Sequence, residues 1–488
     1  MAASTGETGL PFEPDWPTCQ RTLDSPCPGI QIRGFDRCLE HLAPAELDPF
    51  LASLHPGDDL DVRGTTIAAS LSEKLRVAFQ HTNVSRPVFG FGRFEDARII
   101  NAAFFDAQFE RDVDFSDARF DGNARFDGAR FGGNARFNDA RFEWTARFTG
   151  ARFDGEARFD GAWFGDAWFD DARFENAPQF GPVRARWLSL DRAQFTRSIE
   201  MDVEAGSVSC ASTRFEDGVT LRVRYGTVAA FGTVFGAASS IGSTGPHSPW
   251  SASPAWVGEL TERPDRLSTS EPMLTSLRGT DVSNLVLTDV YLGECEFAGA
   301  HRLDQLRVEG RCEFRRPPLG WRWTRRQVLA EEARWRGWPT PAIGPEEAGP
   351  ERLAALYRSL RKAFEDSKNE AGAGDFYYGE MEMRRHSTGT RRAERGILWV
   401  YWLLSGYGQR AGRALAALLV LIATVAVLLA VWGQPPAEAA QIAVGAVVLR
   451  DPGTKLTEAG QWTVMVARVL GPVLLALAVL AVRGRVKR

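Results

Sequence analysis

Phenylalanine recurs at steps of five or six residues from Phe104 to Phe180, and this spacing severely limits the fold of that segment. Within ARFDGNARFDGARFGGNARF, residues 118–137, the tripeptide Ala-Arg-Phe occurs four times, separated by Gly, Asp and Asn. A helix does not explain the pattern, because at about 100° per residue a step of five rotates by about 140° and puts alternate Phe residues on different sides. The recurring Gly residues also argue against a helix, since each costs about 1 kcal/mol in a helix interior.

An extended chain explains the spacing better. Each of these Phe residues from Phe120 to Phe174 has Ala two positions before it, so that both side chains lie on one face of a short strand. The residues that follow, such as Asp121, Gly122 and Asn123, favour a turn. Strand-and-corner units that wind in one direction predict a solenoid, with Phe and Ala inside and the adjoining Arg and Asp outside.

The stretch ARFDGARFGGN resembles the pentapeptide-repeat family, in its Phe-centred variant with alternating units of five and six residues. The resemblance implies a right-handed quadrilateral β-helix with four units in each coil. Together with the helical segments described below, the expected fold class is a β-solenoid with a short α-helical N-terminal region, a helical juxtamembrane hairpin and two C-terminal transmembrane helices.

The repeat pattern also indicates where the solenoid is interrupted. Strand-like alternation begins near Phe94 and continues to about Ile241, where the Gly/Ser/Pro-rich stretch GSTGPHSPWSASP breaks it. A second block has apolar residues at strict steps of five: Leu277, Val282, Leu287, Leu292 and Phe297. We therefore expect an N-terminal region (1–90), a first repeat block (91–241), an excursion (242–270), a second repeat block (271–315), a helical connector with juxtamembrane helices (316–396) and a membrane hairpin (397–488).

Helical periodicity replaces the five-residue step after the second block. One apolar stripe at helical spacing predicts a helix, and it consists of Leu353, Leu356, Tyr357, Leu360 and Phe364. Residues 364–385 are expected to form the second helix of a hairpin, and this stretch resembles the juxtamembrane segment of a membrane-anchored subgroup of pentapeptide-repeat proteins.

Two apolar segments near the C-terminus, Ala414–Trp432 and Val464–Val482, predict transmembrane helices. Arginines precede the first segment and basic residues follow the second, whereas the loop between them contains only Arg450 and Lys455 as basic residues. By the positive-inside rule this distribution predicts a multi-pass cell-membrane protein with both termini and the solenoid in the cytoplasm. The aromatic stretch ILWVYWLLSGYG before the first segment is typical of a helix that lies in the membrane interface.

The loop between the two segments allows a second interpretation of the hairpin. Residues 439–449 are apolar but too short to cross a membrane, and a re-entrant segment here would resemble the architecture of two-helix cation channels. Val444 and Gly445 would then belong to a pore loop, although the loop lacks the Thr-Val-Gly-Tyr-Gly filter of potassium channels. We favour a membrane anchor that can also form homo-oligomers, with the pore as the alternative.

The N-terminal region contains a candidate metal site. Cys19, Cys27, Cys38 and His41 occur in CQRTLDSPCPGIQIRGFDRCLEH, with Pro, Gly and Asp in the gaps. Three thiolates and one imidazole are the ligands of a closed, tetrahedral, structural zinc site. The separation of Cys19 from Cys27 is wider than in common zinc motifs, so unpaired cysteines remain the alternative. Cys210, Cys295 and Cys312 are expected to be buried free thiols.

The remaining patterns favour a protein that binds other proteins. We find no phosphate-binding glycine loop and no His that pairs with a nucleophile at a catalytic spacing, so we do not expect an enzyme. Trp163 and Trp168 replace the usual outward Arg and are candidate contacts for a partner protein, unless the 242–270 excursion covers them. We expect no nucleic-acid partner. A DNA mimic that acts on topoisomerases is a minor alternative, because the regular Arg residues dilute the acidic charge of the repeats.

Overall fold

The computed structural model describes residues 14–20, 26–80, 86–244, 271–318, 325–339, 348–451, 453 and 456–486. The chain divides into two compact units, and each is described by itself below. The first unit comprises Met1–Arg302 with Leu306–Phe314, and the second comprises Leu303–Gln305 with Arg315–Arg488.

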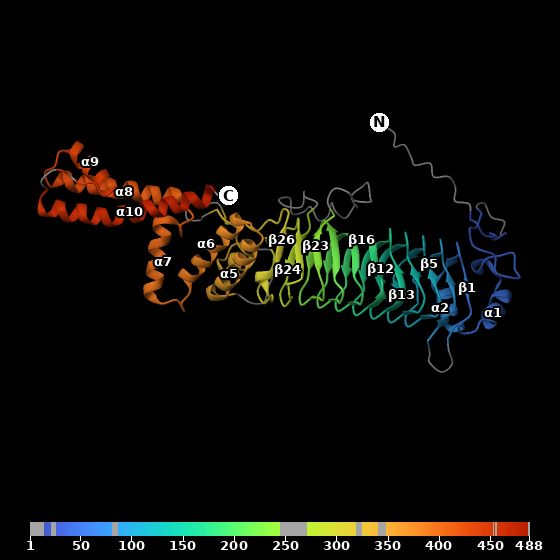
Figure 1. The fold of residues 1–488 in the computed structure, drawn as a ribbon. Coiled ribbons are helices and arrows are strands. Elements are labelled where there is room, and N and C mark those ends of the chain that lie inside the picture. Colours follow the sequence, from blue (N-terminus) through green and yellow to red (C-terminus); the bar gives the residue numbers. More distant parts are fainter. Residues whose placement is uncertain are drawn as a thin grey trace, which may run out of the picture. The chain divides into compact units, whose positions relative to one another are not determined.

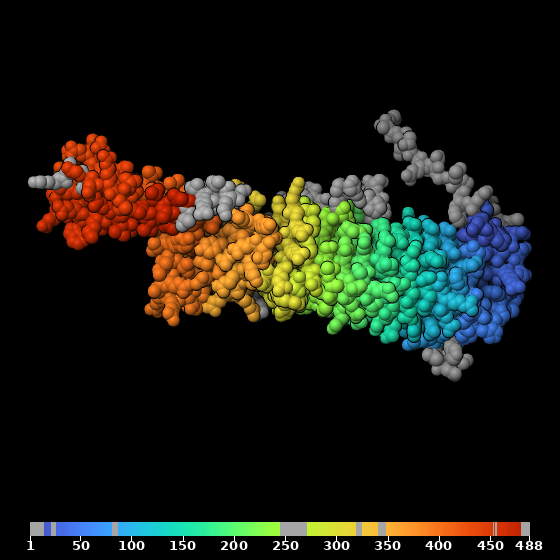
Figure 2. Space-filling model, viewed as in Figure 1, coloured from blue at the N-terminus to red at the C-terminus, as the bar shows by residue number. Residues whose placement is uncertain are grey.

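The first unit is a β-solenoid whose interior is filled by four columns of stacked Phe rings. Rings one coil apart lie face to face, with centroid separations of 5.2 Å for Phe109 and Phe131, 5.0 Å for Phe115 and Phe137, 4.4 Å for Phe120 and Phe142, and 4.8 Å for Phe126 and Phe148. These values match the roughly 4.8 Å spacing of hydrogen-bonded strands, so each ring rests on the equivalent ring of the next coil. Four columns make the coil four-sided, and successive coils pack directly against one another (Figures 1 and 2).

The strands form two long sheets in which every ladder between named strands of the described chain is parallel. One sheet contains β1 (Leu60–Asp61), β3 (Val88–Phe89), β4 (Gly92–Arg93), β6 (Gln108–Phe109), β7 (Val113–Asp114), β10 (Arg130–Phe131), β11 (Ala135–Arg136), β13 (Arg152–Arg158), β15 (Arg173–Asn176), β17 (Gln194–Phe195), β19 (Arg214–Phe215) and β22 (Val234–Phe235). The other contains β2 (Thr66–Ile67), β5 (Arg98–Ile100), β8 (Arg119–Asp121), β9 (Ala124–Arg125), β12 (Arg141–Arg147), β14 (Trp163–Trp168), β16 (Gln179–Ser189), β18 (Ile199–Ser209), β20 (Val219–Arg224), β21 (Thr227–Ala229), β23 (Ser239–Ser243), β24 (Met273–Ser276), β25 (Leu285–Thr288) and β26 (Arg307–Glu309).

The alternation of side chains confirms the predicted interior and exterior. The Phe residues and the Ala residues two positions before them are buried, whereas the intervening Arg side chains are mostly exposed. Some of these arginines reach a carboxylate on a neighbouring coil, as Arg130 does with Asp154 at 2.8 Å and Arg186 with Asp166 at 3.1 Å. Each exposed pair contributes little alone.

The corners explain why Gly and Asp recur in most units. Asp139 turns the chain with a φ of 56°, and Gly161 makes the equivalent turn one coil later with a φ of 76°. A Cβ on Gly161 would lie only 2.1 Å from the Asp139 carboxylate. Gly161 therefore satisfies both the left-handed conformation and the close approach of the coil before it.

The solenoid begins earlier than Phe94. β1 pairs with β4 and β2 pairs with β5, so residues 60–67 already form part of the first coil. The two-residue strands β1 and β2 are too short to show an alternating pattern, which is why sequence periodicity missed them. Helices α1 (Pro44–Ala52) and α2 (Ala69–Ala78), together with the short 3₁₀ helix η1 (Leu39–His41), surround this end.

The 242–270 excursion lies largely outside the described residues. Its first residues, Gly242 and Ser243, still belong to β23. The five apolar residues of the second block, from Leu277 to Phe297, are all fully buried. Cys210 and Cys295 are buried as expected, but Cys312 is only half-buried because it lies where the last coil ends.

The second unit is helical. It contains η2 (Leu303–Gln305), α4 (Ala330–Trp335), α5 (Pro350–Asp366), α6 (Glu370–His386), α7 (Arg392–Ser405), α8 (Ala411–Val431), α9 (Pro436–Val447) and α10 (Glu458–Val486). The α5–α6 hairpin turns at residues 367–369, so that Phe364 belongs to the first helix and not to the second. The Asn369 side chain caps α6 by accepting a hydrogen bond from the Gly372 amide at 3.0 Å, and this local cap ends the first helix early.

Helices α8 and α10 are long and apolar enough to cross a membrane, judged by length and composition. They cover both predicted transmembrane segments except for Trp432, which caps α8, and α10 begins six residues before the predicted start at Val464. In Figure 1, α8 and α10 run side by side, and α7 runs across their direction.

The Phe stack makes a direct prediction about stability. Phe137 lies between Phe115 and Phe159 and is fully buried, so Phe137→Ala should reduce the free energy of unfolding by about 3 to 5 kcal/mol. Chemical denaturation followed by circular dichroism measures the change. The matched control Arg141→Ala removes an exposed side chain four residues away and should change it by less than about 0.5 kcal/mol. Equal losses in both variants would contradict a core built on stacked rings.

Candidate functional site

The four residues predicted as metal ligands converge at the N-terminal end of the solenoid. The Sγ atoms of Cys19, Cys27 and Cys38 and a ring nitrogen of His41 all lie within 4.8 Å of one another. The His41 Nδ1 atom is 3.5 Å from the Cys19 Sγ and 3.2 Å from the Cys38 Sγ, and the Cys27 and Cys38 sulfurs are 3.8 Å apart. No other group of this kind is found among the residues that the structure describes.

These separations fit a tetrahedral metal ion. With metal–sulfur bonds of about 2.3 Å and a metal–nitrogen bond of about 2.05 Å, the tetrahedron requires sulfurs about 3.8 Å apart and a nitrogen about 3.6 Å from each sulfur. The Cys27–Cys38 and Cys19–His41 distances meet these requirements. The cluster can therefore hold a metal ion with four protein ligands.

Local backbone features position the ligands. The Cys19 amide donates a hydrogen bond to the Gly29 carbonyl at 2.8 Å, which ties the first ligand to the Cys27-Pro28-Gly29 turn. A Cβ on Gly29 would lie 2.8 Å from the Cys38 Cβ, so only Gly allows this approach. Cys38 precedes η1, and this single turn brings His41 back over its thiol.

The electrostatics of the cluster favour a bound cation. Burial, followed by the neighbouring Cys27 and Cys19 thiols, raises the pKa of the Cys38 thiol far above its ordinary value. Burial also raises the pKa of Cys27, against the opposing effect of the Gly29 backbone amide. The raised pKa values favour the protonated forms of the Cys27 and Cys38 thiols, whereas a divalent cation in their midst would stabilise the thiolates.

The cluster is fastened to the first coil of the solenoid. The Ile30 amide donates to the Arg63 carbonyl at 2.8 Å, and the Trp16 indole donates to the Pro28 carbonyl at 2.8 Å. The Arg63 guanidinium lies over the Trp16 ring at 4.9 Å. A metal ion would therefore lock the segment that closes this end of the sheets.

Exposed tryptophans lie on one side of the solenoid, but not all where the sequence indicated. Trp168 is exposed, with 39% of its surface accessible, whereas Trp163 is less exposed and is half-buried. Two tryptophans that we did not predict are exposed on the neighbouring strands, Trp144 at 67% on β12 and Trp187 at 40% on β16. Each stands two positions after an inward residue, where the repeats normally have small or polar turn residues, and this anomaly was the signal that we missed.

On the described part of the solenoid three tryptophans are exposed, and we call them the tryptophan surface: Trp144, Trp168 and Trp187. Trp187 aligns with Asp166 on β14, and a Cβ on Gly165 would lie 2.6 Å from the Trp144 carbonyl. Through Asp166, Trp187 aligns with Thr145 two coils earlier, about 10 Å along the solenoid axis, and Trp144 directly precedes Thr145. On the coil between them lie Gly165, which has no side chain, and Asp166, whose carboxylate pairs with Arg186.

The comparison with protein-family models matches the solenoid. The model for pentapeptide repeats (9 copies) matches residues 77–130, 104–145 and 137–184. This chain is a pentapeptide-repeat protein. The searches of the curated proteins and of the solved structures found no match. The match to the family ends at residue 184, so it carries no information on the metal cluster or on the second unit of this pentapeptide-repeat protein.

The residues proposed for a pore loop lie on a helix. Val444 and Gly445 belong to α9, which packs one face against α8 and α10 through Ala439, Ile442 and Ala443. The Val444 side chain points away from that contact and is 52% exposed. The segment is therefore helical, as a re-entrant helix would be, and the small residues on its packed face allow close contact between helices.

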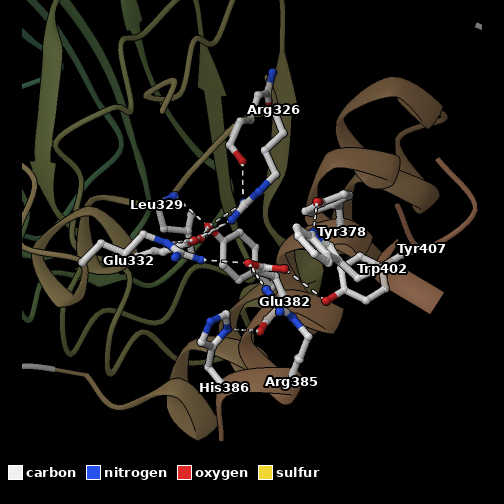
Figure 3. Close-up of polar contacts among 12 residues, drawn as sticks. Arg326, Leu329, Glu332, Tyr378, Glu382, Arg385, His386, Trp402 and Tyr407 are labelled. Carbon is white, nitrogen blue, oxygen red and sulfur yellow. Dashed lines mark hydrogen bonds and ion pairs between the residues drawn. The ribbon is translucent and has the colours of Figure 1, made fainter. Parts of the chain in front are cut away.

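The second unit of this pentapeptide-repeat protein contains a buried ionic network that sequence reasoning missed. Glu332 is fully buried and accepts hydrogen bonds from Arg326 at 2.5 and 2.6 Å, from Arg336 at 2.7 Å, and from the Tyr357 hydroxyl. Arg336 also reaches Glu382 at 3.3 Å. In Figure 3 the two carboxylates lie among arginine and tyrosine side chains.

The network extends to the segment that leads into α8. The Tyr407 hydroxyl donates to Glu382 at 3.0 Å, and Arg385 donates to the same carboxylate at 2.8 Å. Tyr407 is fully buried and has a φ of 55°, an uncommon conformation for a residue other than glycine. One connected set of charges thus fastens α4, α5, α6 and the α7–α8 connection together.

Removing one charge from this network should be costly. Burial alone raises the pKa of Glu332, but Arg326 and Arg336 outweigh it and hold the pKa below the ordinary value. Glu332→Gln leaves two buried guanidinium groups short of a counter-charge, so the unfolding free energy of the second unit should fall by about 3 to 5 kcal/mol. Hydrogen exchange of α4 to α6 measures this loss. Glu365→Gln, which alters an exposed pair with Arg361, is the control.

The same shift predicts a pH dependence with a definite sign. Because the folded-state pKa of Glu332 is depressed, its stabilisation is complete above the unfolded pKa of about 4.3 and is lost as the pH falls through the lower folded value. Hydrogen exchange between pH 7 and 3 should show the acid-dependent loss in the native chain. If Glu332→Gln loses the same amount of protection as the pH falls, the acid-dependent loss belongs to other carboxyl groups.

Proposed function

We propose that this pentapeptide-repeat protein is a non-enzymatic scaffold, fixed to the membrane by its C-terminal helices, whose cytoplasmic solenoid binds another protein. The observation that carries the proposal is the tryptophan surface. Large aromatic side chains in water mark protein interfaces, and the stacked Phe core gives the surface a rigid support. A protein partner is favoured over a nucleic acid, because several of the exposed arginines are already paired with carboxylates.

The membrane attachment rests on α8, α10 and the basic residues around them. Arg410 and Arg413 lie at the start of α8, and Arg483 and Arg485 lie near the end of α10. Because these ends are the more basic ones, the positive-inside rule puts both termini and the solenoid in the cytoplasm. The solenoid would then present its surface to soluble partners close to the membrane.

Helix α7 supports this arrangement by its two apolar faces. Leu398 and Trp402 pack toward α6, where the Trp402 indole donates to the Tyr378 hydroxyl at 3.0 Å. Ile397, Val400 and Leu403 face away from that contact, with 69%, 49% and 49% of their surfaces exposed. A helix that runs across the direction of α8 with such a face is suited to lie in the membrane interface.

We propose zinc as the metal of the Cys19, Cys27, Cys38 and His41 cluster. Three thiolates and one imidazole in a tetrahedral arrangement are the preferred ligands of Zn²⁺. Four protein ligands leave no open coordination position, so the ion has a structural role and supplies no catalytic centre. Its role would be to close the N-terminal end of the solenoid, which every open solenoid requires.

Metal binding can be measured directly. Purified protein should contain one zinc ion per chain by elemental analysis, and Co²⁺ should replace it with the visible spectrum of a tetrahedral thiolate site. Cys38→Ser should abolish binding and lower the thermal stability of the first coil, because the ion's binding free energy is part of the folding free energy. Cys312→Ser, which changes a thiol outside the cluster, should retain the metal. Full zinc content in Cys38→Ser would refute the assignment.

The tryptophan surface can be tested by paired variants. Proteins that co-purify with the native chain should be lost from the double variant Trp144→Ser/Trp187→Ser and retained by Phe231→Ser, which alters an exposed aromatic elsewhere on the solenoid. For a purified partner, the double variant should weaken binding by about 30-fold or more, as expected when a central aromatic contact worth about 2 kcal/mol is removed. Equal binding by the three proteins would place the interface elsewhere.

A further inference from the structure

A charged, irregular segment lies beside the middle of α10. The segment follows α9, whose last turn is closed by a hydrogen bond from the Arg450 amide to the Gly445 carbonyl at 2.8 Å. From α10 the Arg468 side chain donates to the Asp451 carboxylate at 2.5 Å and to the Arg450 carbonyl at 3.1 Å. The Arg468 Nε atom is buried and has no hydrogen-bond partner among the described residues.

This segment lies deep within the span if α8 and α10 cross the membrane, which is the proposed function on which the inference rests. From Glu458 to Arg468 the helix rises about 15 Å, half of the roughly 30 Å hydrocarbon core. The end of α9 is deeper still, because Val447 packs against Leu418, about 20 Å along α8 from Val431, and against Leu474, about 24 Å along α10 from Glu458. Helix α9 therefore enters from the end where α8 stops and ends beyond mid-depth.

The residues at this depth are unsuited to lipid. The Asp451 side chain is 90% exposed and the Arg450 side chain is also exposed. Irregular backbone and ionised side chains are tolerated at such depth only where protein covers them or where they line water. The hydrophobic side chains beside them, Val448 and Leu449, are 63% and 62% exposed, so a single chain leaves the whole face uncovered.

We infer that a second copy of the chain covers this face, and that the copies enclose an aqueous pathway for small anions lined by Arg450, Asp451 and Arg468. A second copy is the occupant that fits, because the face combines apolar side chains with an ion pair that needs a polar neighbour. Each copy contributes two guanidinium groups against one carboxylate, so the pathway has a net positive charge. Rings of Arg favour anions in pores.

The test uses the full-length chain in liposomes, with halide efflux followed by a fluorescent halide probe and potassium flux measured in parallel. We expect halide flux that depends on the chain. Arg450→Glu reverses a charge that lines the pathway and leaves the Arg468–Asp451 pair in place, so the halide-to-potassium permeability ratio should fall by at least about fivefold. Arg311→Glu reverses an exposed charge on the solenoid and should leave the ratio unchanged.

Two further measurements separate the inference from the anchor. If alkaline washing releases the chain from the vesicles, the chain is not inserted in the membrane, and the inference fails with the anchor. If the chain resists washing but gives no halide flux, the pathway is overturned and the anchor stands. The same conclusion follows if Arg450→Glu keeps the native halide-to-potassium permeability ratio. Photobleaching of labelled chains should show two or more copies in each assembly, and single copies would also overturn the inference.

Discussion

The stacking of Phe on Phe is the interaction on which the first unit depends. A ring that lies about 5 Å from its equivalent in the next coil sets the same spacing that hydrogen-bonded strands require, so side chains and backbone favour one geometry. The interior left by four such columns is narrow, which is why small Ala residues share it with the rings. The columns also fix the positions of the side chains exposed on the solenoid, including those of the tryptophan surface.

A stack of identical coils has two ends that its own repeats cannot close. At the N-terminal end the chain provides short strands, two helices and the thiol cluster, in which Gly29 allows the Cys38 side chain to approach the Cys27 turn. Burial raises the pKa of the Cys38 thiol, and a cation bound among the thiols would favour their thiolate forms and strengthen this cap.

The second unit is held together by a different kind of interaction. Where the solenoid relies on identical apolar contacts, α4 to α7 are held by dissimilar, buried charges centred on Glu332 and Glu382. Such networks add specificity more reliably than stability, because every member must find its own partner. The Tyr407 hydroxyl donates to Glu382, so the network also fixes the turn that leads into α8.

The sequence by itself determined the solenoid, the outward position of Arg and the cluster of three thiols and one imidazole, because each depends on a local, repeated or closely spaced pattern. Steps of five and six residues reveal which side chains share a face, and Cys38 and His41 are separated by a single turn. Only the tertiary structure decided the rest. The contact of Arg336 with Glu382 joins residues 46 positions apart, and Arg468 meets Asp451 only because α9 folds back between two long helices. No periodicity records such pairings, since they arise from the packing of whole helices and not from the spacing of residues along one of them.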